Sequence, residues 1–550
     1  MNYIEKYQLW VSKATDETVK EQLQQMSGND EQIKDAFYKD LEFGTAGLRG
    51  IMGAGSNCLN VYTIAQATQG VAMYMEAHGF KKAAITYDSR LNAQLFCHKT
   101  AEVLAFNGIE CVITKECMPT PFMSYMIRQL KCDMGINITA SHNPSQYNGY
   151  KVYDCNGCQL LEKDASEITG YFTNVDGFSV NTLPIEQCIE KGIVTYCDEI
   201  LEKQYIDKAC SQAFDRADGL SVTYTPLNGA GYRLVPEALR KLGVKDLFIV
   251  PEQAYPDGNF PTCSYPNPEK AEAMTLALKY ADETQSDIVI GTDPDSDRLG
   301  VAVKHNGEYR LLTGNEVGIL LADYILSNLQ QRNLLTSEHV VVKTIVSSAM
   351  VDKICQNYGV KVVSVLTGFK YIGNVINNLE KQGKENLYVF GFEESCGYLK
   401  GTYVRDKDAV VASVMFADMC ATYKKQGMTA LDKLNQLYEK YGVYFNVTYS
   451  YRFPGADGAV RKQQLLDGLR NNAPSHIDGK EVVTVVDYEK DETGIPKANV
   501  LKYIMADGSQ LIVRPSGTEP LIKCYITLCG QCVTEEEIAS IKSFLDGMFA

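Results

Sequence analysis

Thr139-Ala140-Ser141-His142-Asn143-Pro144 is the stretch from which the rest of the chain can be interpreted. Before it, residues 134–138 form a short apolar run that predicts a buried strand; after it, Asn148-Gly149 is a turn signal and residues 150–153 resume strand-like alternation. We therefore expect Ser141 on an exposed loop at a strand end, where α/β proteins place reactive groups. A serine hydroxyl is a weak nucleophile until a base, a metal or a lowered pKa activates it, so the rest of the sequence must supply that partner.

The size and composition of the chain limit its class. Its 550 residues exceed one hydrophobic core and predict three or four domains, and 45% hydrophobic with 22% charged residues is typical of a folded globular protein. Because no apolar run reaches membrane-spanning length and residues 1–20 are too polar for a signal peptide, we expect a cytoplasmic protein without membrane contact. A net charge of −15 disfavours nucleic acid as a partner, yet local basic loops could still hold an anionic small molecule.

The 17 cysteines are odd in number and scattered, which favours reduced thiols over a disulfide framework. Two Cys-x-x-Cys pairs, Cys155/Cys158 and Cys529/Cys532, have the spacing of a zinc or redox site. Neither pair has a companion histidine pair, so the sequence disfavours both roles.

Hydrophobic periodicity divides the chain into several units. Helical spacing in residues 1–40 is followed by three successive alternations of helix and strand, a rhythm that predicts βαβ units and largely parallel sheets. In the first unit we expect helices at 65–78 and 93–107 and strands at 83–87 and 110–113. In the second we expect strands at 220–224, 247–250 and 287–291 with a helix at 234–242. In the third we expect strands at 340–343, 360–365 and 387–391.

Beyond about residue 440 the pattern changes to strands and turns. Strands are expected at 445–453, 481–488, 510–513 and 522–528, followed by a helix from residue 535. This pattern predicts an α+β domain, and because no low-complexity linker separates the units, we expect all of them to pack around a shared cleft.

Asp293, Asp295 and Asp297 follow an apolar run and stand at alternate positions, so on an extended backbone they would point one way and Ser296 the other. Three converging carboxylates repel one another unless a hard cation neutralises them, and oxygen ligands suit Mg²⁺. An EF-hand is excluded because its sixth and twelfth loop positions would be Arg298 and Lys304 instead of glycine and glutamate. An acidic solvated loop is the simpler alternative, but it is disfavoured directly after an apolar strand.

Three further segments carry groups that could contact a ligand. The segment 43–50 is a glycine-rich loop with one arginine; its glycines permit close backbone approach to a ligand, although such turns are also common without one. Residues 391–398 carry adjacent glutamates and a serine that could bind sugar hydroxyls, although an ordinary helix N-terminus would have the same composition. Residues 514–520 combine an arginine with two hydroxyls around a glycine, which favours phosphate over a plain hairpin turn.

Common catalytic motifs are missing from the sequence. It contains no Gly-x-x-x-x-Gly-Lys-Ser/Thr, no Gly-x-Ser-x-Gly and no His-Glu-x-x-His. Ser141 and His142 are neighbours, but consecutive side chains on an extended backbone point to opposite sides, so adjacency alone does not make them half of a hydrolytic triad.

Taken together and in this order, the four loops resemble those of the α-D-phosphohexomutase superfamily, specifically its long phosphoglucomutase/phosphopentomutase branch, from residue 43 to about 525. The resemblance implies three similar α/β domains with mostly parallel mixed sheets and a smaller C-terminal α+β domain around one central cleft. We expect domain boundaries at 1–212 (phosphoserine loop), 213–318 (metal-binding loop), 319–438 (sugar-binding loop) and 439–550 (phosphate-binding loop).

The resemblance also implies a mechanism. Ser141 would be phosphorylated and exchange its phosphoryl group with a sugar monophosphate through a glucose 1,6-bisphosphate intermediate. Its phosphate would ligate Mg²⁺ together with Asp293, Asp295 and Asp297. Lys151 matches the general acid/base, and Arg49 and His142 would orient the reacting groups. Substrate contacts are implied for Arg298, Lys343, Thr367, Lys370, Glu393, Ser395, Arg514, Ser516, Gly517 and Thr518.

The expected reaction is the interconversion of glucose 1-phosphate and glucose 6-phosphate. Some phosphomannomutase relatives carry a histidine near the position of Tyr398, and its absence here disfavours mannose. Phosphopentomutase, phosphomannomutase and glucose 1,6-bisphosphate synthase remain alternatives; a phosphatase or a silent sugar-phosphate sensor is more remote. The oligomeric state, monomer or homodimer, is left open.

Overall fold

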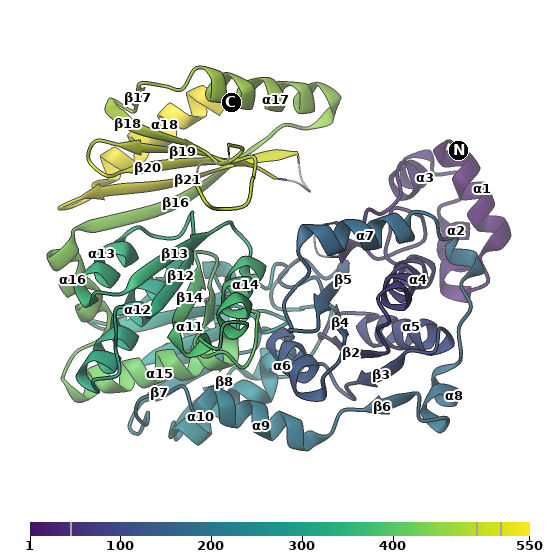
Figure 1. The fold of residues 1–550 in the computed structure, drawn as a ribbon, viewed down its shortest axis with the longest axis horizontal. Coiled ribbons are helices and arrows are strands. Elements are labelled where there is room, and N and C mark those ends of the chain that lie inside the picture. The colour runs from purple at the N-terminus through teal and green to yellow at the C-terminus, as the bar shows by residue number, and fades with distance from the viewer. Residues whose placement is uncertain (45–46, 491–492, 517–519, 550) are drawn as a thin grey trace.

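The computed structural model of the chain describes residues 1–44, 47–490, 493–516 and 520–549. Four sheets follow one another along the chain: the first three mix parallel and antiparallel pairs, whereas all pairs of the fourth are antiparallel (Figure 1). The predicted fold class, three α/β domains and a C-terminal sheet domain, is confirmed. Among the described helices, none combines the length and apolar character needed to cross a membrane.

The N-terminal region forms helices, as predicted. They are α1 (Tyr3–Lys13), α2 (Glu17–Gln25) and α3 (Asp30–Phe37). Each begins after an Asn or Asp whose side chain accepts a backbone N–H of the first turn, which satisfies a donor that the helix itself cannot pair. The Trp10 ring packs edge-on against Phe37 and against Tyr62 of the first domain, so the three helices are anchored there.

The first domain holds a six-stranded sheet in the order β1-β5-β4-β2-β3-β6. Strand β4 (Met134–Ile138) is fully buried, as its apolar sequence predicts, and it ends immediately before the Ser141 loop. The remaining strands and main helices are β1 (Gly47–Ile51), β2 (Lys82–Tyr87), β3 (Glu110–Ile113), β5 (Tyr147–Asp154), β6 (Val194–Tyr196), α4 (Val61–Ala77), α5 (Ala93–Phe106), α6 (Thr120–Leu130), α7 (Glu162–Phe172), α8 (Ile185–Glu190) and α9 (Glu199–Cys210).

The glycine-rich segment departs from its prediction as a loop. From Gly47 onward it is strand β1, antiparallel to β5, with Gly47 opposite Lys151. Gly47 has φ of +131°, and a Cβ there would lie 1.8 Å from the Tyr150 carbonyl oxygen, so only glycine permits this close pairing. Because Arg49 is two residues beyond Gly47 on β1, it lies on the same face of the sheet as Lys151. Residues 45 and 46 lie outside the described residues.

In the second and third domains, strands end at two of the predicted loops. In the second, β9 (Ile288–Thr292) ends directly before the aspartate loop; in the third, β14 (Tyr388–Glu393) ends at the predicted sugar loop. The second domain further contains β7 (Ser221–Thr225), β8 (Asp246–Ile249), β10 (Leu299–His305), β11 (Glu308–Leu312), α10 (Leu234–Leu242) and α11 (Ala271–Thr284). The third contains β12 (Val340–Thr344), β13 (Lys361–Val365), β15 (Gly397–Leu399), α12 (Gly314–Gln331), α13 (Met350–Tyr358), α14 (Phe369–Glu380), α15 (Ala409–Lys425) and α16 (Ala430–Tyr441).

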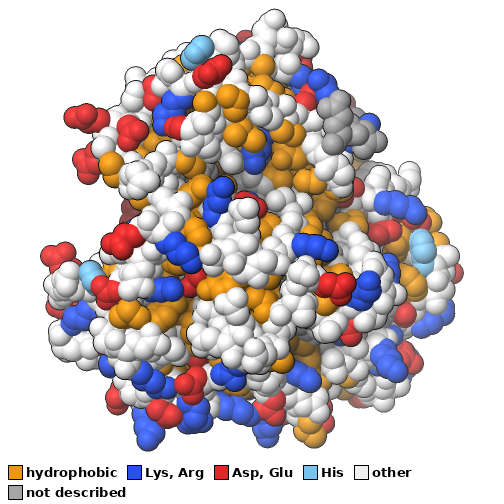
Figure 2. All heavy atoms as spheres, turned by 60° about the vertical axis from the view of Figure 1, so that its left-hand side comes forward, with side chains coloured by type: hydrophobic (Ala, Val, Ile, Leu, Met, Phe, Trp, Pro, Cys, Tyr) orange, Lys and Arg blue, Asp and Glu red, His pale blue; other side chains and the backbone are white. Residues whose placement is uncertain are grey.

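The C-terminal domain is an antiparallel sheet covered by helices on one face (Figure 1). Its elements are β16 (Val443–Arg452), β17 (His476–Ile477), β18 (Lys480–Asp487), β19 (Leu501–Met505), β20 (Gln510–Pro515), β21 (Leu521–Gly530), α17 (Gly455–Asn471) and α18 (Glu535–Phe549). One face forms a core with α17 and α18. The other face packs against Ile345, Val346 and Leu366 of the third domain. In the space-filling view, hydrophobic and basic side chains gather where these two domains meet (Figure 2).

Candidate active site

Ser141 and the aspartate loop meet where the first two domains touch. The Ser141 hydroxyl donates a hydrogen bond to Asp293 Oδ2 at 2.8 Å, and its backbone N–H donates to Thr139 Oγ1 at 2.8 Å. The prediction that this serine would be exposed is wrong: only 4% of its surface is accessible. The loop does lie at a strand end, but the second domain covers it.

The expected geometry of Ser141 and His142 is also corrected. Ser141 has a left-handed backbone with φ of +54°, so the loop is turned instead of extended, and His142 Nδ1 lies 3.1 Å from Ser141 Oγ. Burial and the charges of Arg298 and Arg49 hold the pKa of His142 well below its usual range, so the imidazole is neutral. Because the serine proton is directed to Asp293, Nδ1–H of His142 is assigned as a donor to Oγ, which is not the role of a triad base.

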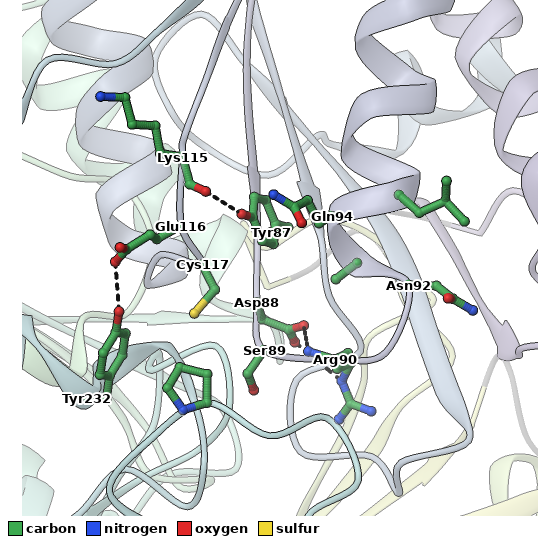
Figure 3. A pocket seen from close by; sticks show the side chains of 13 residues that line it. Tyr87, Asp88, Ser89, Arg90, Asn92, Gln94, Lys115, Glu116, Cys117 and Tyr232 are labelled. Atoms are coloured by element: carbon green, nitrogen blue, oxygen red, sulfur yellow. Dashed lines mark hydrogen bonds and ion pairs between the residues drawn. The ribbon is translucent and has the colours of Figure 1, made fainter. Parts of the chain in front are cut away.

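Arg90, which the sequence analysis missed, fixes the shape of the serine loop. Its guanidinium donates to the carbonyls of Pro144 (2.9 Å) and Tyr147 (2.8 Å) as well as those of Ser141 and Asn143. Asp88 holds this arginine through a buried ion pair at 3.3 Å and accepts the Thr139 hydroxyl at 2.6 Å. Figure 3 shows Asp88 and Arg90 after β2, beside a hollow of about 530 Å³. Their position directly after a buried strand was the available sequence signal.

Asp293, Asp295 and Asp297 converge, as predicted: one oxygen from each lies within 4.8 Å of the others, and all three are buried. The expected extended backbone is wrong, however. Residues 294–296 form a turn with φ of +50° at Ser296, and Asp293 Oδ1 closes it by accepting the N–H groups of Asp297 (3.1 Å) and Arg298 (3.0 Å). The Ser296 hydroxyl lies against Gly231, and no hydrogen bond to it is found among the described residues.

The unfilled oxygens of this cluster fit a hard cation. Asp295 Oδ1 and both carboxylate oxygens of Asp297 are buried and make no hydrogen bond among the described residues, although Asp297 Oδ2 is ion-paired with Lys407 at 2.8 Å. Burial, and then the neighbouring Asp295, raise the pKa of Asp293 and of Asp297, which is the signature of carboxylates forced together. A divalent cation would satisfy these oxygens and relieve the repulsion.

Two lysines face the carboxylates. Lys151 Nζ lies 2.8 Å from Asp295 Oδ2 and 3.7 Å from Asp297 Oδ2, and Lys407 Nζ lies 2.8 Å from Asp297 Oδ2. Burial alone would lower the lysine pKa values and raise that of Asp295, but the opposite charges outweigh it: the pKa of each lysine is raised and that of Asp295 is held well below its usual range. Lys407 was missed by the sequence analysis because it lies on a loop ahead of α15, outside every motif.

A polar chain from the first domain supports Asp295. Thr120 donates its hydroxyl to Asp295 Oδ2 at 2.8 Å, and Asn137 Nδ2 donates to Thr120 Oγ1 at 2.7 Å. All three groups are buried. The carboxylate is therefore oriented by a neighbouring domain, a contact that no local motif could have indicated.

The predicted sugar loop is a β-hairpin between β14 and β15, not a helix N-terminus. Glu393 Oε1 accepts the backbone N–H of Gly368 at 2.8 Å, which brings Thr367 beside it. Arg298 Nη1 donates to the Ser395 carbonyl at 3.1 Å, so the aspartate loop and the sugar loop are directly joined. Burial raises the pKa of Glu393.

The remaining predicted residues lie in the first, third and C-terminal domains. Arg49 is exposed and its charge interacts with Arg298, Asp295 and Asp297. Lys370 Nζ is paired with Glu162 of the first domain at 2.8 Å, and Lys343 Nζ with Asp352 at 3.1 Å. Arg514 lies close to the Tyr525 side chain, and Ser516 donates its backbone N–H to the Leu521 carbonyl at 2.9 Å. Gly517 and Thr518 lie outside the described residues.

No second metal site competes with this one within the described part of the chain. Its only group of three or more closely spaced metal-ligating side chains is the aspartate cluster. The thiols of Cys155, Cys158, Cys529 and Cys532 are all free, and that of Cys158 donates to the Lys370 carbonyl at 3.3 Å. The expectation of reduced cysteines agrees with these contacts.

Comparison with known proteins assigns the chain to a family. Residues 40–177, 195–307 and 313–441 match domains I, II and III of the phosphoglucomutase/phosphomannomutase family, each described as an α/β/α domain. A phosphoglucomutase from Staphylococcus aureus is 34% identical over 549 residues, which covers 97% of both chains.

Solved structures share the fold. A phosphoglucomutase/phosphomannomutase family protein from Burkholderia thailandensis aligns over 92% of this chain and 96% of its own with a TM-score of 0.70 at 19% identity. An N-acetylphosphoglucosamine mutase from Aspergillus fumigatus, crystallised with GlcNAc-6P and magnesium, aligns over 97% and 99% with a TM-score of 0.51 at 14% identity. A further crystal structure of the Aspergillus enzyme contains glucose 1,6-bisphosphate. The chain therefore belongs to the phosphoglucomutase/phosphomannomutase family of the α-D-phosphohexomutase superfamily.

Proposed function

We propose that this enzyme interconverts glucose 1-phosphate and glucose 6-phosphate through a phosphorylated Ser141 and a glucose 1,6-bisphosphate intermediate. The observation that carries the proposal is the contact between Ser141 Oγ and Asp293 Oδ2, 2.8 Å long, at the edge of three buried carboxylates faced by two lysines. A serine in that position is a covalent phosphoryl carrier in a site built for negative charge. The name of the Staphylococcus aureus relative supports glucose as the sugar.

The chain's own residues provide each part of the transfer. Arg90 and Thr139 hold the serine loop in its turned shape, so the phosphoryl oxygen is presented from a rigid position. In the first transfer the bond between Ser141 Oγ and phosphorus breaks while a sugar hydroxyl forms a new bond to phosphorus. The sugar hydroxyl proton would pass by way of Lys151 to the departing Ser141 Oγ. In the second transfer Ser141 Oγ gives up that proton as it attacks, and the proton would pass back by way of Lys151 to the sugar oxygen that leaves.

The aspartate cluster is the proposed magnesium site. Asp293, Asp295 and Asp297 would hold the cation together with the phosphoserine, in keeping with their unfilled oxygens. Bound Mg²⁺ would offset the charge that builds up on the phosphoryl group during transfer. Glucose 1,6-bisphosphate would restore any enzyme that has lost its phosphate.

The other loops would hold the sugar. Glu393 and Ser395 can accept and donate hydrogen bonds to ring hydroxyls, while Arg298 joins their loop to the aspartates. Arg49 and His142 would contact the transferring phosphate. Lys343, Thr367, Lys370 and the segment Arg514-Ser516-Gly517-Thr518 would bind the other end of the substrate.

A side-by-side assay of glucose 1-phosphate, mannose 1-phosphate and ribose 1-phosphate tests the proposed substrate. We expect the highest kcat/KM for glucose 1-phosphate, with glucose 6-phosphate as product and a requirement for catalytic amounts of glucose 1,6-bisphosphate. Ribose or mannose as the best substrate would replace the proposal by the pentomutase or mannomutase alternative. Release of inorganic phosphate at the rate of turnover would indicate a phosphatase, and net accumulation of bisphosphate would indicate a synthase.

Arg514→Ala is expected to raise KM about tenfold and also to lower kcat, because a phosphate that is not reacting positions the one that is. A loosely held bisphosphate should dissociate before it reorients for the second transfer, so the variant should need more added glucose 1,6-bisphosphate. Steady-state kinetics with varied bisphosphate measure this. Arg514→Lys keeps the charge but loses the bidentate guanidinium, so its KM should lie between those of the wild type and Arg514→Ala. Unchanged KM and bisphosphate demand in Arg514→Ala would show that the loop is only a hairpin.

A further inference from the structure

One face of the C-terminal sheet turns basic side chains toward the third domain. Lys502 on β19 is opposite Ile512 on β20, which in turn is opposite Tyr525 on β21, so these side chains share a face. Arg514 is two residues beyond Ile512 and therefore lies on the same face. Because Ile512 and Tyr525 pack against Ile345, Val346 and Leu366, this face is the one that meets the third domain.

Lys502 is half-buried at this junction beside another lysine. Lys343, at the end of β12, is buried, and its Nζ lies 3.1 Å from Asp352 and 3.3 Å from the Ser347 carbonyl. Within the described residues, neither a hydrogen bond nor an ion pair engages the Lys502 ammonium. Burial and then the charge of Lys343 lower the pKa of Lys502 to about 8, while Asp352 acts weakly in the opposite direction.

The charges around Lys502 favour the binding of an anion. Asp352 is the carboxylate that interacts with the ammonium groups of Lys343 and Lys502, and its side chain is 45% exposed. A half-buried ammonium without a partner is unfavourable, and a phosphate supplies several acceptor oxygens and up to two negative charges at once. β12 and β14 are parallel neighbours, so Lys343 and Glu393, each near the carboxyl end of its strand, lie at the same edge of the third sheet. Lys343 is paired with Phe392, one residue before Glu393 at the start of the proposed sugar-binding loop.

We infer that Lys502 binds the non-reacting phosphate of the substrate, across the domain junction from Lys343 and on the same sheet face as Arg514. The inference rests on the proposed function and adds a residue to it that none of the sequence motifs contains. A phosphate held by both lysines would link the C-terminal sheet to the third domain, against which it already packs. Lys502 is thus a binding residue for the phosphate and takes no part in the transfer itself.

The inference carries a pH dependence. The charged groups around Lys502 are Lys343 on β12 and Asp352 on α13; Tyr444 on β16 faces Asp352, and burial raises its pKa, so it stays neutral. Lys502 binds phosphate only when protonated. KM should therefore be constant below about pH 8 and rise above it as the ammonium is lost, while kcat stays level.

Lys502→Met tests the inference, with Lys462→Met as the control: Lys462 lies on α17, which covers the opposite face of the same sheet. We expect Lys502→Met to raise KM for glucose 1-phosphate about tenfold with kcat within about twofold. Its KM should no longer rise above pH 8, and inorganic phosphate should raise its melting temperature less than that of the control. The melting temperature without phosphate should be unchanged or higher, since a repelled charge is removed.

The outcomes separate the two proposals. Unchanged KM, unchanged pH profile and full stabilisation by phosphate in Lys502→Met would overturn the role of Lys502 and leave the mutase proposal intact. If the wild type fails to convert glucose phosphates, the proposed function falls. The phosphate-induced shift in melting temperature then decides on Lys502 by itself, because inorganic phosphate probes the site without any sugar.

Discussion

Ser141→Ala is expected to abolish mutase turnover, with a loss of at least about a thousandfold in kcat, because the reaction needs a covalent acceptor between its two transfers. The protein should still fold. The substitution removes one hydroxyl and leaves Asp293 Oδ2 without its serine donor, which costs about 1–3 kcal/mol. The coupled assay with glucose 1-phosphate and a thermal melt of the same preparation measure both effects.

Ser296→Ala is the matched control for this experiment. Its hydroxyl lies in the neighbouring aspartate loop, is equally buried, and makes no hydrogen bond to the described residues, so its removal should leave activity within about threefold. Incubation with ³²P-labelled glucose 1,6-bisphosphate should label the wild type and Ser296→Ala but not Ser141→Ala. An active Ser141→Ala protein with an unchanged melting temperature would remove this serine from the mechanism.

Asp297→Asn is expected to lower kcat by at least about a hundredfold and to weaken magnesium binding together with it. Asp297 is buried beside the two other aspartates and is ion-paired with Lys407. Asparagine keeps the shape of its side chain but removes the charge that a cation needs. Calorimetric titration with Mg²⁺ measures affinity directly, without relying on activity. For the wild type, EDTA should remove activity and added Mg²⁺ should restore it.

Asp418→Asn is the matched control for the metal site. Asp418 is also a buried carboxylate, but it accepts the Tyr324 hydroxyl at 2.8 Å and the Phe214 N–H at 2.7 Å, away from the aspartate cluster. It should retain wild-type magnesium affinity even if it lowers the melting temperature. Full activity of the wild type after exhaustive treatment with EDTA would show that the cluster serves another purpose.

Much of the fold was predictable because it rests on short-range patterns. The buried run of β4 and the helix Leu234–Leu242 appear where hydrophobic periodicity placed them, because local backbone preference and burial agree there. The first strand escaped prediction because its pairing depends on Gly47 approaching Tyr150 about 100 residues away. The domain boundaries, the location in the cell and the oligomeric state stay predictions.

Local patterns also misjudged backbone shape at both reacting loops. Ser141 and the aspartate turn were treated as extended, yet each contains a residue with positive φ. Arg90 holds the serine loop in that shape from a distance in sequence, whereas Asp293 closes the aspartate turn from within it. A left-handed residue costs about 1 kcal/mol or more outside glycine, so it persists only where surrounding contacts compensate. Arg90, Thr120 and Lys407 were missed for the same reason: each acts through partners far along the chain.

The sequence by itself determined the chemistry of the protein: a serine loop, three alternate aspartates, a glutamate-serine loop and an arginine-glycine turn in a family-specific order. These are residue types whose donors, acceptors and charges do not depend on fold. Tertiary structure alone decided that Ser141 is buried against Asp293, that Lys151 and Lys407 balance the aspartates, and that the charge of Lys343 acts on Lys502. The physical reason is that burial and charge proximity set the energy of an ionisable group, and both arise only when separate domains pack together.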